Sequence, residues 1–142
     1  PASRRIMTST YNFADLHEMQ LAPCAYSMTF NVSKGRLNAI LNQRSQDMLT
    51  ANNWNVCQYA ALLIMFAKAS GLEAGELVHV IADAHIYDRH VDTVKRLIEK
   101  KPYPAPEMQV EDIADFYKFT KNSFTAVDYK YHEFTEKIPV AI

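Results

Sequence analysis

The chain has 142 residues, a formal net charge of −1 and 49% hydrophobic residues, which suffices for one globular domain with its own core. The near-zero charge argues against bulk attraction to nucleic acid or membranes, and no apolar run approaches the roughly 20 residues of a membrane-spanning helix. Its two cysteines form no pattern typical of a disulfide framework or a zinc site. We therefore expect a cytoplasmic protein without a bound metal.

The first 43 residues predict three β-strands and one helical turn. Stretches that are β-branched and aromatic, or that alternate apolar with polar residues, mark strands at residues 5–11, 26–32 and 36–43, and the helical turn falls at 13–19. Gly35 lies between the last two strands, where a glycine accepts the positive φ of a tight turn. This hairpin brings Cys24, just before it, and Arg44, just after it, to the same end.

A long helix is predicted at about residues 55–70. Asn52 or Asn53 suits its N-cap and Gly71 its carboxyl-terminal cap. The helix is apolar almost all round, so we expect it to be buried on several sides. Cys57 lies in it, and we expect that cysteine to be a core residue.

The second half of the chain alternates short helices and strands. We expect a strand at 76–82, a helix that opens at Asp88 or Asp92 and runs to Lys101, an extended proline-rich loop at 102–106, a strand at 108–110 and a helix or turn at 113–119. Strands and helices therefore mix along the whole chain. The fold class is α/β or α+β.

Several polar residues indicate a functional site only if the fold brings them close together. Taken alone, Cys24 is most often a small buried hydrophobe, and a reactive cysteine needs a nearby cation, which Arg44 across the hairpin supplies. Arg44 and Ser45 make a good phosphate-binding pair, although an isolated arginine more often forms a surface ion pair. Arg4 and Arg5 are a second adjacent pair, whose side chains point to opposite faces of a strand.

The remaining candidates also have two interpretations. Asn55 either caps the helix or hydrogen-bonds to the edge of a pyrimidine. Asp47 either accepts hydrogen bonds from the donor edge of a group such as a pterin, or pairs with Arg44. His85 and Tyr87 lie two residues apart at a strand end, so both can face one sugar hydroxyl, although a lone histidine is usually structural. Together with Asp83, Asp88 and His90, His85 matches no common metal spacing.

Taken together, these motifs match a family. The chain resembles the carboxyl-terminal half of folate-dependent thymidylate synthases, in the family's order and with nearly its spacing, over essentially the whole chain. The matching stretches are Ser3–Ile6, Leu21–Cys24, Gln43–Asp47, Trp54–Ala60, Asp83–Tyr87 and Pro139–Ile142.

The resemblance implies a fold and a reaction. The fold is a mixed twisted sheet packed with a long buried helix, and residues 1–142 form the carboxyl-terminal part of a synthase domain. The reaction is reductive methylation of dUMP to dTMP, in which 5,10-methylenetetrahydrofolate is the co-substrate and supplies both a carbon and a hydride. The resemblance implies no metal.

The resemblance also implies roles for individual residues. Cys24 is the nucleophile that adds to C6 of dUMP, and the catalytic set is Cys24, Arg44 and Asn55. The dUMP contacts are Arg4, Arg5, Gln43, Arg44, Ser45, Asp47, Asn55, His85 and Tyr87, and the folate contacts are Asp47, Ala141 and Ile142. Arg4 and Arg5 reach the neighbouring subunit's nucleotide, so the protein is expected to be a homodimer.

The chain departs from the family pattern in three places. Ala51–Trp54 replaces the usual Gly-x-Pro-Phe, and Ala25 stands where many members have a histidine. The family's amino-terminal half, with its catalytic glutamate, is not in this sequence, so we expect a fragment with impaired activity. Two alternatives stay open: a dCMP hydroxymethylase, against which Asn55 favours dUMP, and a dimerising half that binds nucleotide without turnover.

Overall fold

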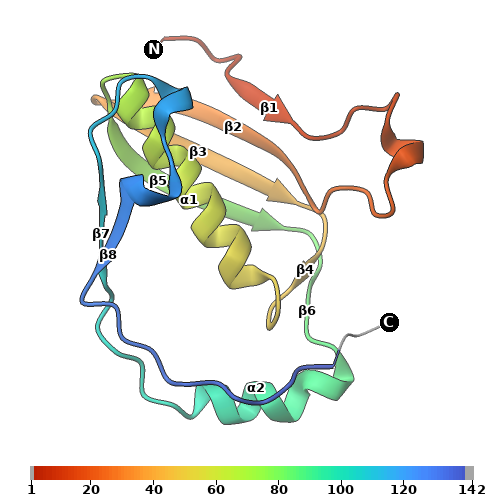
Figure 1. Cartoon of the computed structure of the whole chain (residues 1–142). Coiled ribbons are helices and arrows are strands. Elements are labelled where there is room, and N and C mark those ends of the chain that lie inside the picture. The colour runs from red at the N-terminus through yellow and green to blue at the C-terminus, as the bar shows by residue number, and fades with distance from the viewer. Residues whose placement is uncertain (1, 140–142) are drawn as a thin grey trace.

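The computed structural model describes residues 2–139 and is built around a four-stranded mixed sheet with a long helix across one face (Figure 1). The strand order is β1-β2-β3-β5. The first two pairings are antiparallel and β3 with β5 is parallel. The bounds are β1 Met7–Ser9, β2 Ala25–Ser33, β3 Arg36–Gln43, β5 Glu73–Ile81 and, for the helix, α1 Asn52–Ala69. The predicted mixed fold is confirmed.

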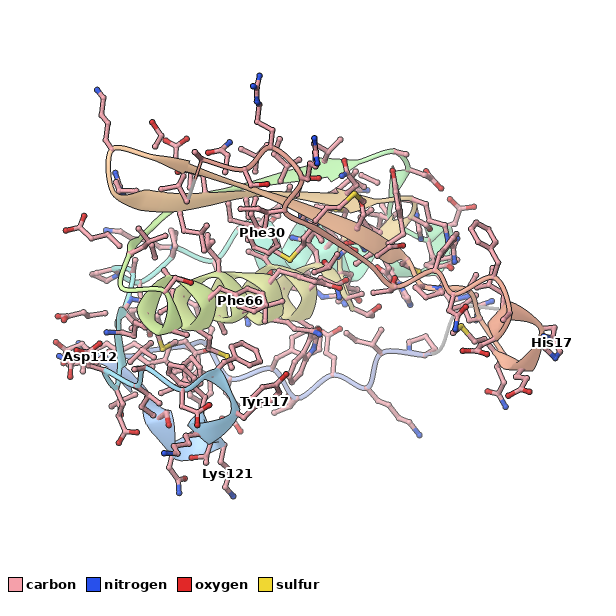
Figure 2. The ribbon with its side chains drawn as sticks, turned by 90° about the horizontal axis from the view of Figure 1, so that it is seen from above. His17, Phe30, Phe66, Asp112, Tyr117 and Lys121 are labelled. Atoms are coloured by element: carbon pink, nitrogen blue, oxygen red, sulfur yellow. The ribbon has the colours of Figure 1, made fainter. Side chains whose placement is uncertain are left out.

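The core lies between the sheet and α1. The alternation in β3 is as predicted, since Leu37, Ala39 and Leu41 are buried while Ile40 remains 39% exposed on the other face. The rest of the core comes from β2 and α1, namely Ala25, Met28, Phe30, Leu63 and Ala67. Figure 2 shows Phe30 of the sheet and Phe66 of α1 facing each other, and their rings meet edge to face at 5.5 Å.

The hairpin between β2 and β3 follows from its turn residues. Lys34 and Gly35 both have positive φ, 50° and 77°, the combination that fits the twist of a two-residue hairpin. Ser33 pairs with Arg36 across the turn, and Ala25 pairs with Gln43 at the open end. The residues just outside that open end are therefore neighbours, as the sequence predicts for Cys24 and Arg44.

The helix α1 differs from its prediction in its start and its burial. Ala51, not Asn52 or Asn53, is the N-cap, and its side chain has no oxygen with which to cap the helix. The predicted burial on several sides is overstated, because only Leu63 and Ala67 of α1 are fully buried. One face packs on the sheet, and the rest of the helix is only partly covered. Phe66, which meets Phe30 of the sheet, also stacks on Phe116 at 4.8 Å.

Cys57 is exposed, so its prediction as a core residue is wrong. It lies in the amino-terminal half of α1, where Trp54 is also 78% exposed. An all-round apolar helix gives no sequence signal of which face meets the sheet. Only the packing against the sheet settles which side chains point outward.

The second half of the chain wraps around this core. A two-stranded parallel pair, β4 (Gln46–Asp47) and β6 (Ala84–His85), continues from the ends of β3 and β5. After it come the 3₁₀ turn η2 (Asp88–His90) and α2 (Val91–Ile98). The hairpin of β7 (Glu107–Val110) and β8 (Phe124–Val127) lies beyond α1, and the final segment returns along α2 (Figure 1).

Several predicted boundaries shift. β1 is shorter than residues 5–11, β5 begins at Glu73 instead of residue 76, and α2 begins after His90 and ends at Ile98 instead of Lys101. The helical stretches at 13–19 and 113–119 shrink to the 3₁₀ turns η1 (Leu16–Glu18) and η3 (Phe116–Lys118), and the sequence did not predict β8 or η4 (Lys121–Ser123). Among residues 2–139, no helix is long and apolar enough to cross a membrane.

Candidate active site

The centre of the site is Cys24, with Arg44 beside it. The open end of the hairpin brings the two together, and the backbone N–H of Arg44 donates to the Cys24 carbonyl at 2.9 Å. The guanidinium donates to the carbonyls of Ala22 at 2.6 Å and Pro23 at 3.2 Å, and its Nη2 lies 3.6 Å from the Cys24 sulfur. A fixed cation next to a half-buried thiol is the setting in which a cysteine acts as a nucleophile.

Arg44 is held in place and still has capacity for a ligand. Its contacts to Ala22 and Pro23 use the Nε and Nη2 groups, and a guanidinium has more N–H donors than these contacts occupy. Arg44 does not pair with Asp47. An arginine whose plane is already oriented loses little conformational freedom when it binds an anion.

A partly buried amide network centres on Gln43, the last residue of β3. Gln43 is 2% exposed, and its amide nitrogen donates to the Ser45 carbonyl at 2.8 Å and to Asn55 Oδ1 at 3.2 Å. Its amide oxygen lies 2.9 Å from His79 Nε2, which is therefore the donor in this pair. Because the side-chain oxygen of Asn55 accepts from Gln43, the amide N–H groups of Asn55 remain available to bind a ligand.

The sequence prediction missed His79. Burial lowers its pKa below the ordinary 6.5, so the ring is neutral near pH 7 and carries its proton on Nε2. His79 shares the half-buried side of β5 with Leu77 and Ile81, while Val78 and Val80 face outward. The signal in the sequence was a polar residue, His79, at a position of the strand whose side chain points inward.

Asp47 caps the turn that leads into α1. Its carboxylate accepts hydrogen bonds from the backbone N–H groups of Leu49 and Thr50 and from the Thr50 hydroxyl. Burial opposes ionisation, but these hydrogen bonds prevail and lower the pKa of Asp47 below 3.8. The alternative that Asp47 pairs with Arg44 is wrong, because each side chain has other partners.

His85 and Tyr87 lie together, next to Asp47 in the β4–β6 pairing. Asp47 and His85 are direct partners in that short sheet. The His85 and Tyr87 rings meet edge to face at 5.1 Å, and His85 Nδ1 lies 3.6 Å from an Asp83 oxygen. His90, which the sequence analysis considered only as a metal ligand, is 2% exposed and packs against the Tyr87 ring at 5.7 Å.

The structure does not bring every predicted residue to this site. Arg4 and Arg5 precede β1 and are exposed, and neither guanidinium has an interaction partner among residues 2–139. Ala141 and Ile142 lie outside the described residues. Within the described part of the chain, no group of three or more His, Cys, Asp and Glu side chains is arranged to hold a metal ion.

Comparison with known proteins agrees with the fold and the motifs. The thymidylate synthase family model matches residues 1–142. The thymidylate synthase of Bacillus phage phi3T is 39% identical over 132 residues, which are 92% of this chain and 47% of that protein. The bifunctional dihydrofolate reductase-thymidylate synthase of Paramecium tetraurelia is 39% identical over 133 residues, 94% of this chain and 29% of that protein.

A solved structure shows the same arrangement of elements. The thermostable thymidylate synthase A from Bacillus subtilis superposes with a TM-score of 0.91 at 37% identity, covering 96% of this chain and 50% of that one. The chain thus spans about half the length of that enzyme and of the phage relative. The family model, the identities and the superposition agree, and the chain belongs to the thymidylate synthase family.

Proposed function

We propose that the protein containing this chain converts dUMP to dTMP by reductive methylation, with Cys24 as the nucleophile and 5,10-methylenetetrahydrofolate as co-substrate. The observation that carries the proposal is the contact between Arg44 and the Cys24 sulfur at 3.6 Å. It joins a nucleophile to an anion-binding group at the end of one hairpin. The related proteins named thymidylate synthase support the same reaction.

The chain's own groups account for the activation of the pyrimidine. The Cys24 thiolate forms a bond to C6, and the electron pair of the C5–C6 double bond moves toward the carbonyl oxygen at C4. The free N–H groups of Asn55, oriented by Gln43, stabilise the charge that develops there. This makes C5 nucleophilic. The folate supplies the carbon and the hydride.

The other predicted contacts surround this centre. Arg44 and Ser45 bind the phosphate, His85 and Tyr87 bind the ribose hydroxyl, and the ionised Asp47 binds the pterin. The side-by-side rings of His85 and Tyr87 and the lowered pKa of Asp47 support these roles. In this proposal Ala141 and Ile142 close over the folate and exclude water from the intermediate.

A homodimer is part of the proposal. Arg4 and Arg5 reach the phosphate site of the second subunit, which agrees with their exposure and their lack of partners among residues 2–139. The face of the sheet opposite α1 exposes apolar side chains, each 39–48% accessible: Ile40, Val78 and Val80. An apolar sheet face of this kind is typical of a contact between copies.

The proposal also covers the domain to which the chain belongs and its cellular location. Residues 1–142 form the carboxyl-terminal part of a synthase domain that works in the cytoplasm. The remaining proton transfers are assigned to groups outside these residues. We therefore expect the isolated chain to bind nucleotide weakly and to release no tritium from [5-³H]dUMP.

The test is covalent trapping with 5-fluoro-dUMP and methylenetetrahydrofolate in the natural-length protein. We expect a stable ternary adduct by mass spectrometry, lost in Cys24→Ser and kept in Cys57→Ser, the matched control at the exposed cysteine. An adduct that survives Cys24→Ser rejects the nucleophile. If the protein instead adds a hydroxymethyl group to dCMP, the hydroxymethylase alternative is correct.

A further inference from the structure

Three elements meet at the side chain of Gln43: the carboxyl-terminal parts of β3 and β5 and the first turn of α1 (Figure 1). Gln43 is 2% exposed. Its partners are His79 of β5, Asn55 of α1 and the backbone carbonyl of Ser45. A side-chain amide buried this deeply must satisfy its oxygen and its nitrogen inside the protein. These partners therefore determine which way the amide faces.

The direction of the hydrogen bonds follows from one backbone group. The Ser45 carbonyl can only accept, and it lies 2.8 Å from Gln43 Nε2. The amide oxygen of Gln43 therefore faces His79, whose Nε2 donates to it at 2.9 Å. The amide nitrogen can only donate, so Asn55 must present its oxygen to Gln43, at 3.2 Å. The hydrogen bonds thus run in one direction, from His79 through Gln43 to Asn55.

His79 supplies the donor at the start of this relay. It lies opposite Leu41 in the parallel β3–β5 register, so its ring is on the α1 face of the sheet and reaches along the strand to Gln43. Burial lowers the pKa of His79 below 6.5. Near pH 7 the ring is therefore neutral, and the contact selects the tautomer with hydrogen on Nε2. Without this donor the Gln43 oxygen would be buried and unpaired, which is costly.

Asn55 is the residue at which the relay ends. Its backbone N–H donates to the Ala51 carbonyl at 3.0 Å in the first turn of α1, so the helix fixes its backbone and leaves the side-chain amide to be oriented. With its oxygen toward Gln43, Asn55 keeps its N–H groups for an acceptor on the ligand. The reversed amide would set N–H groups of Asn55 and Gln43 against each other. The base of dUMP has a carbonyl at C4 and that of dCMP an amino group, so the fixed orientation matches the first and opposes the second.

We propose that His79 is a positioning residue for pyrimidine selection: its hydrogen bond to Gln43 keeps the N–H groups of Asn55 toward the base, so that the site prefers a carbonyl at C4 over an amino group. The inference rests on the proposed function, because that function places Asn55 at the pyrimidine. An asparagine that can turn its amide accepts either base. The relay removes this freedom without any contact between His79 and the substrate.

Nitrogen NMR tests the direction of the hydrogen bonds with no substrate present. In the natural-length protein at about pH 7.5, we expect the His79 ring to give the signals of the neutral tautomer with hydrogen on Nε2. His79→Gln identifies these signals by their loss. A His79 ring that carries its hydrogen on Nδ1 overturns the inference, because Nε2 then has no hydrogen to donate to Gln43.

Calorimetric titration with dUMP and with dCMP tests the role in selection. We expect His79→Phe, which keeps a ring and removes the donor, to lower the ratio of dUMP affinity to dCMP affinity roughly 3- to 10-fold, the factor for one hydrogen bond. His79→Gln can donate from its own amide and should restore most of the ratio. His17→Phe is the matched control at an exposed histidine of η1 and should leave the ratio unchanged.

The outcomes distinguish the inference from the proposed function. An equal loss of affinity for both nucleotides in His79→Phe, or no loss, overturns the inference. If the unmodified protein prefers dUMP but does not convert it, the proposed reaction fails, and the affinity ratio in the variants still decides the role of His79. A preference of the unmodified protein for dCMP overturns both. If His79→Phe does not fold, the smaller His79→Leu decides by the same ratio.

Discussion

The sheet side and the α2 side of the molecule are held in different ways. On the sheet side, Cys24, Arg44 and Gln43 lie at the ends of paired strands, and their hydrogen bonds run to backbone carbonyls and to the half-buried amide of Asn55. On the other side, the segment that ends at Pro139 lies exposed along α2 and is held by a few side-chain contacts. Cys24 is held by paired strands, whereas the segment that ends at Pro139 is held by side chains of η2 and α2.

The comparison has a chemical meaning. A nucleophile and its cation must be in place before the substrate arrives, and the sheet provides that order. A segment that is held by a few exposed side-chain contacts opens more easily than a paired strand. Changes on the sheet side should therefore affect chemistry and stability, and changes at exposed positions of α2 should alter the stability of the fold little.

The largest expected effect is at the nucleophile. Cys24→Ser in the natural-length protein should lower turnover by at least about 1,000-fold, because an alcohol is a far weaker nucleophile than a thiolate. Tritium release from [5-³H]dUMP measures it. Cys57→Ser should keep full activity, and comparable loss in both variants would contradict the assignment.

The next effect is a difference in the free energy of unfolding between variants on the two sides. Leu41→Ala, at a side chain with 0% exposure in the core, should lower the free energy of unfolding by about 2–5 kcal/mol. Ile98→Ala, at a side chain 76% exposed in α2, should change it by less than about 0.5 kcal/mol. Urea unfolding measures both. Similar losses would show that α2 belongs to the core.

A smaller effect is expected in the amide network. Gln43→Leu leaves Asn55 and His79 without their partner, so dUMP binding should weaken by about 1–3 kcal/mol. Gln43→Glu is the matched comparison, since it keeps the acceptor for His79 and loses the donor to Asn55. Calorimetric titration with dUMP gives both values. Equal affinity in Gln43→Leu and the unmodified protein would show that Asn55 needs no orientation.

The smallest effect is a pH dependence at His79. Its pKa in the folded protein lies below the ordinary 6.5 because burial disfavours the charged ring. Below pH 6.5 the unfolded chain therefore binds more protons than the folded one, and stability falls as the pH drops through this range. Urea unfolding from pH 7.5 to 5 should show this decline, and His79→Gln should flatten it. An identical decline in both proteins would exclude His79 as its source.

The sequence indicated much of the sheet side. Alternation placed Leu37, Ala39 and Leu41 inward, and Gly35 marked the turn that brings Cys24 to Arg44. These features follow from short-range rules, since side chains alternate along a strand and a two-residue turn fixes the pairing. The prediction of the hairpin end needed nothing from the rest of the chain.

The helix α2 was predicted, but its long-range contacts were not. Nothing in the sequence near Arg96 or His90 points to Glu136 or Pro139, which lie 40 and 49 residues further on. The exposure of Cys57 was likewise mispredicted, because an all-round apolar helix does not reveal which face meets the sheet. Contacts across such distances depend on how the whole chain is packed.

The sequence by itself determined the family, the mixed fold and the pairing of a cysteine with an arginine, because each rests on local patterns and ordered motifs. Only the tertiary structure decided which histidines serve the site. His79 is neutral because it lies half-buried beside Gln43, and His90 is fixed because a distant carbonyl accepts its hydrogen bond. Burial and long-range contact are properties of the packed chain, and a sequence pattern records neither.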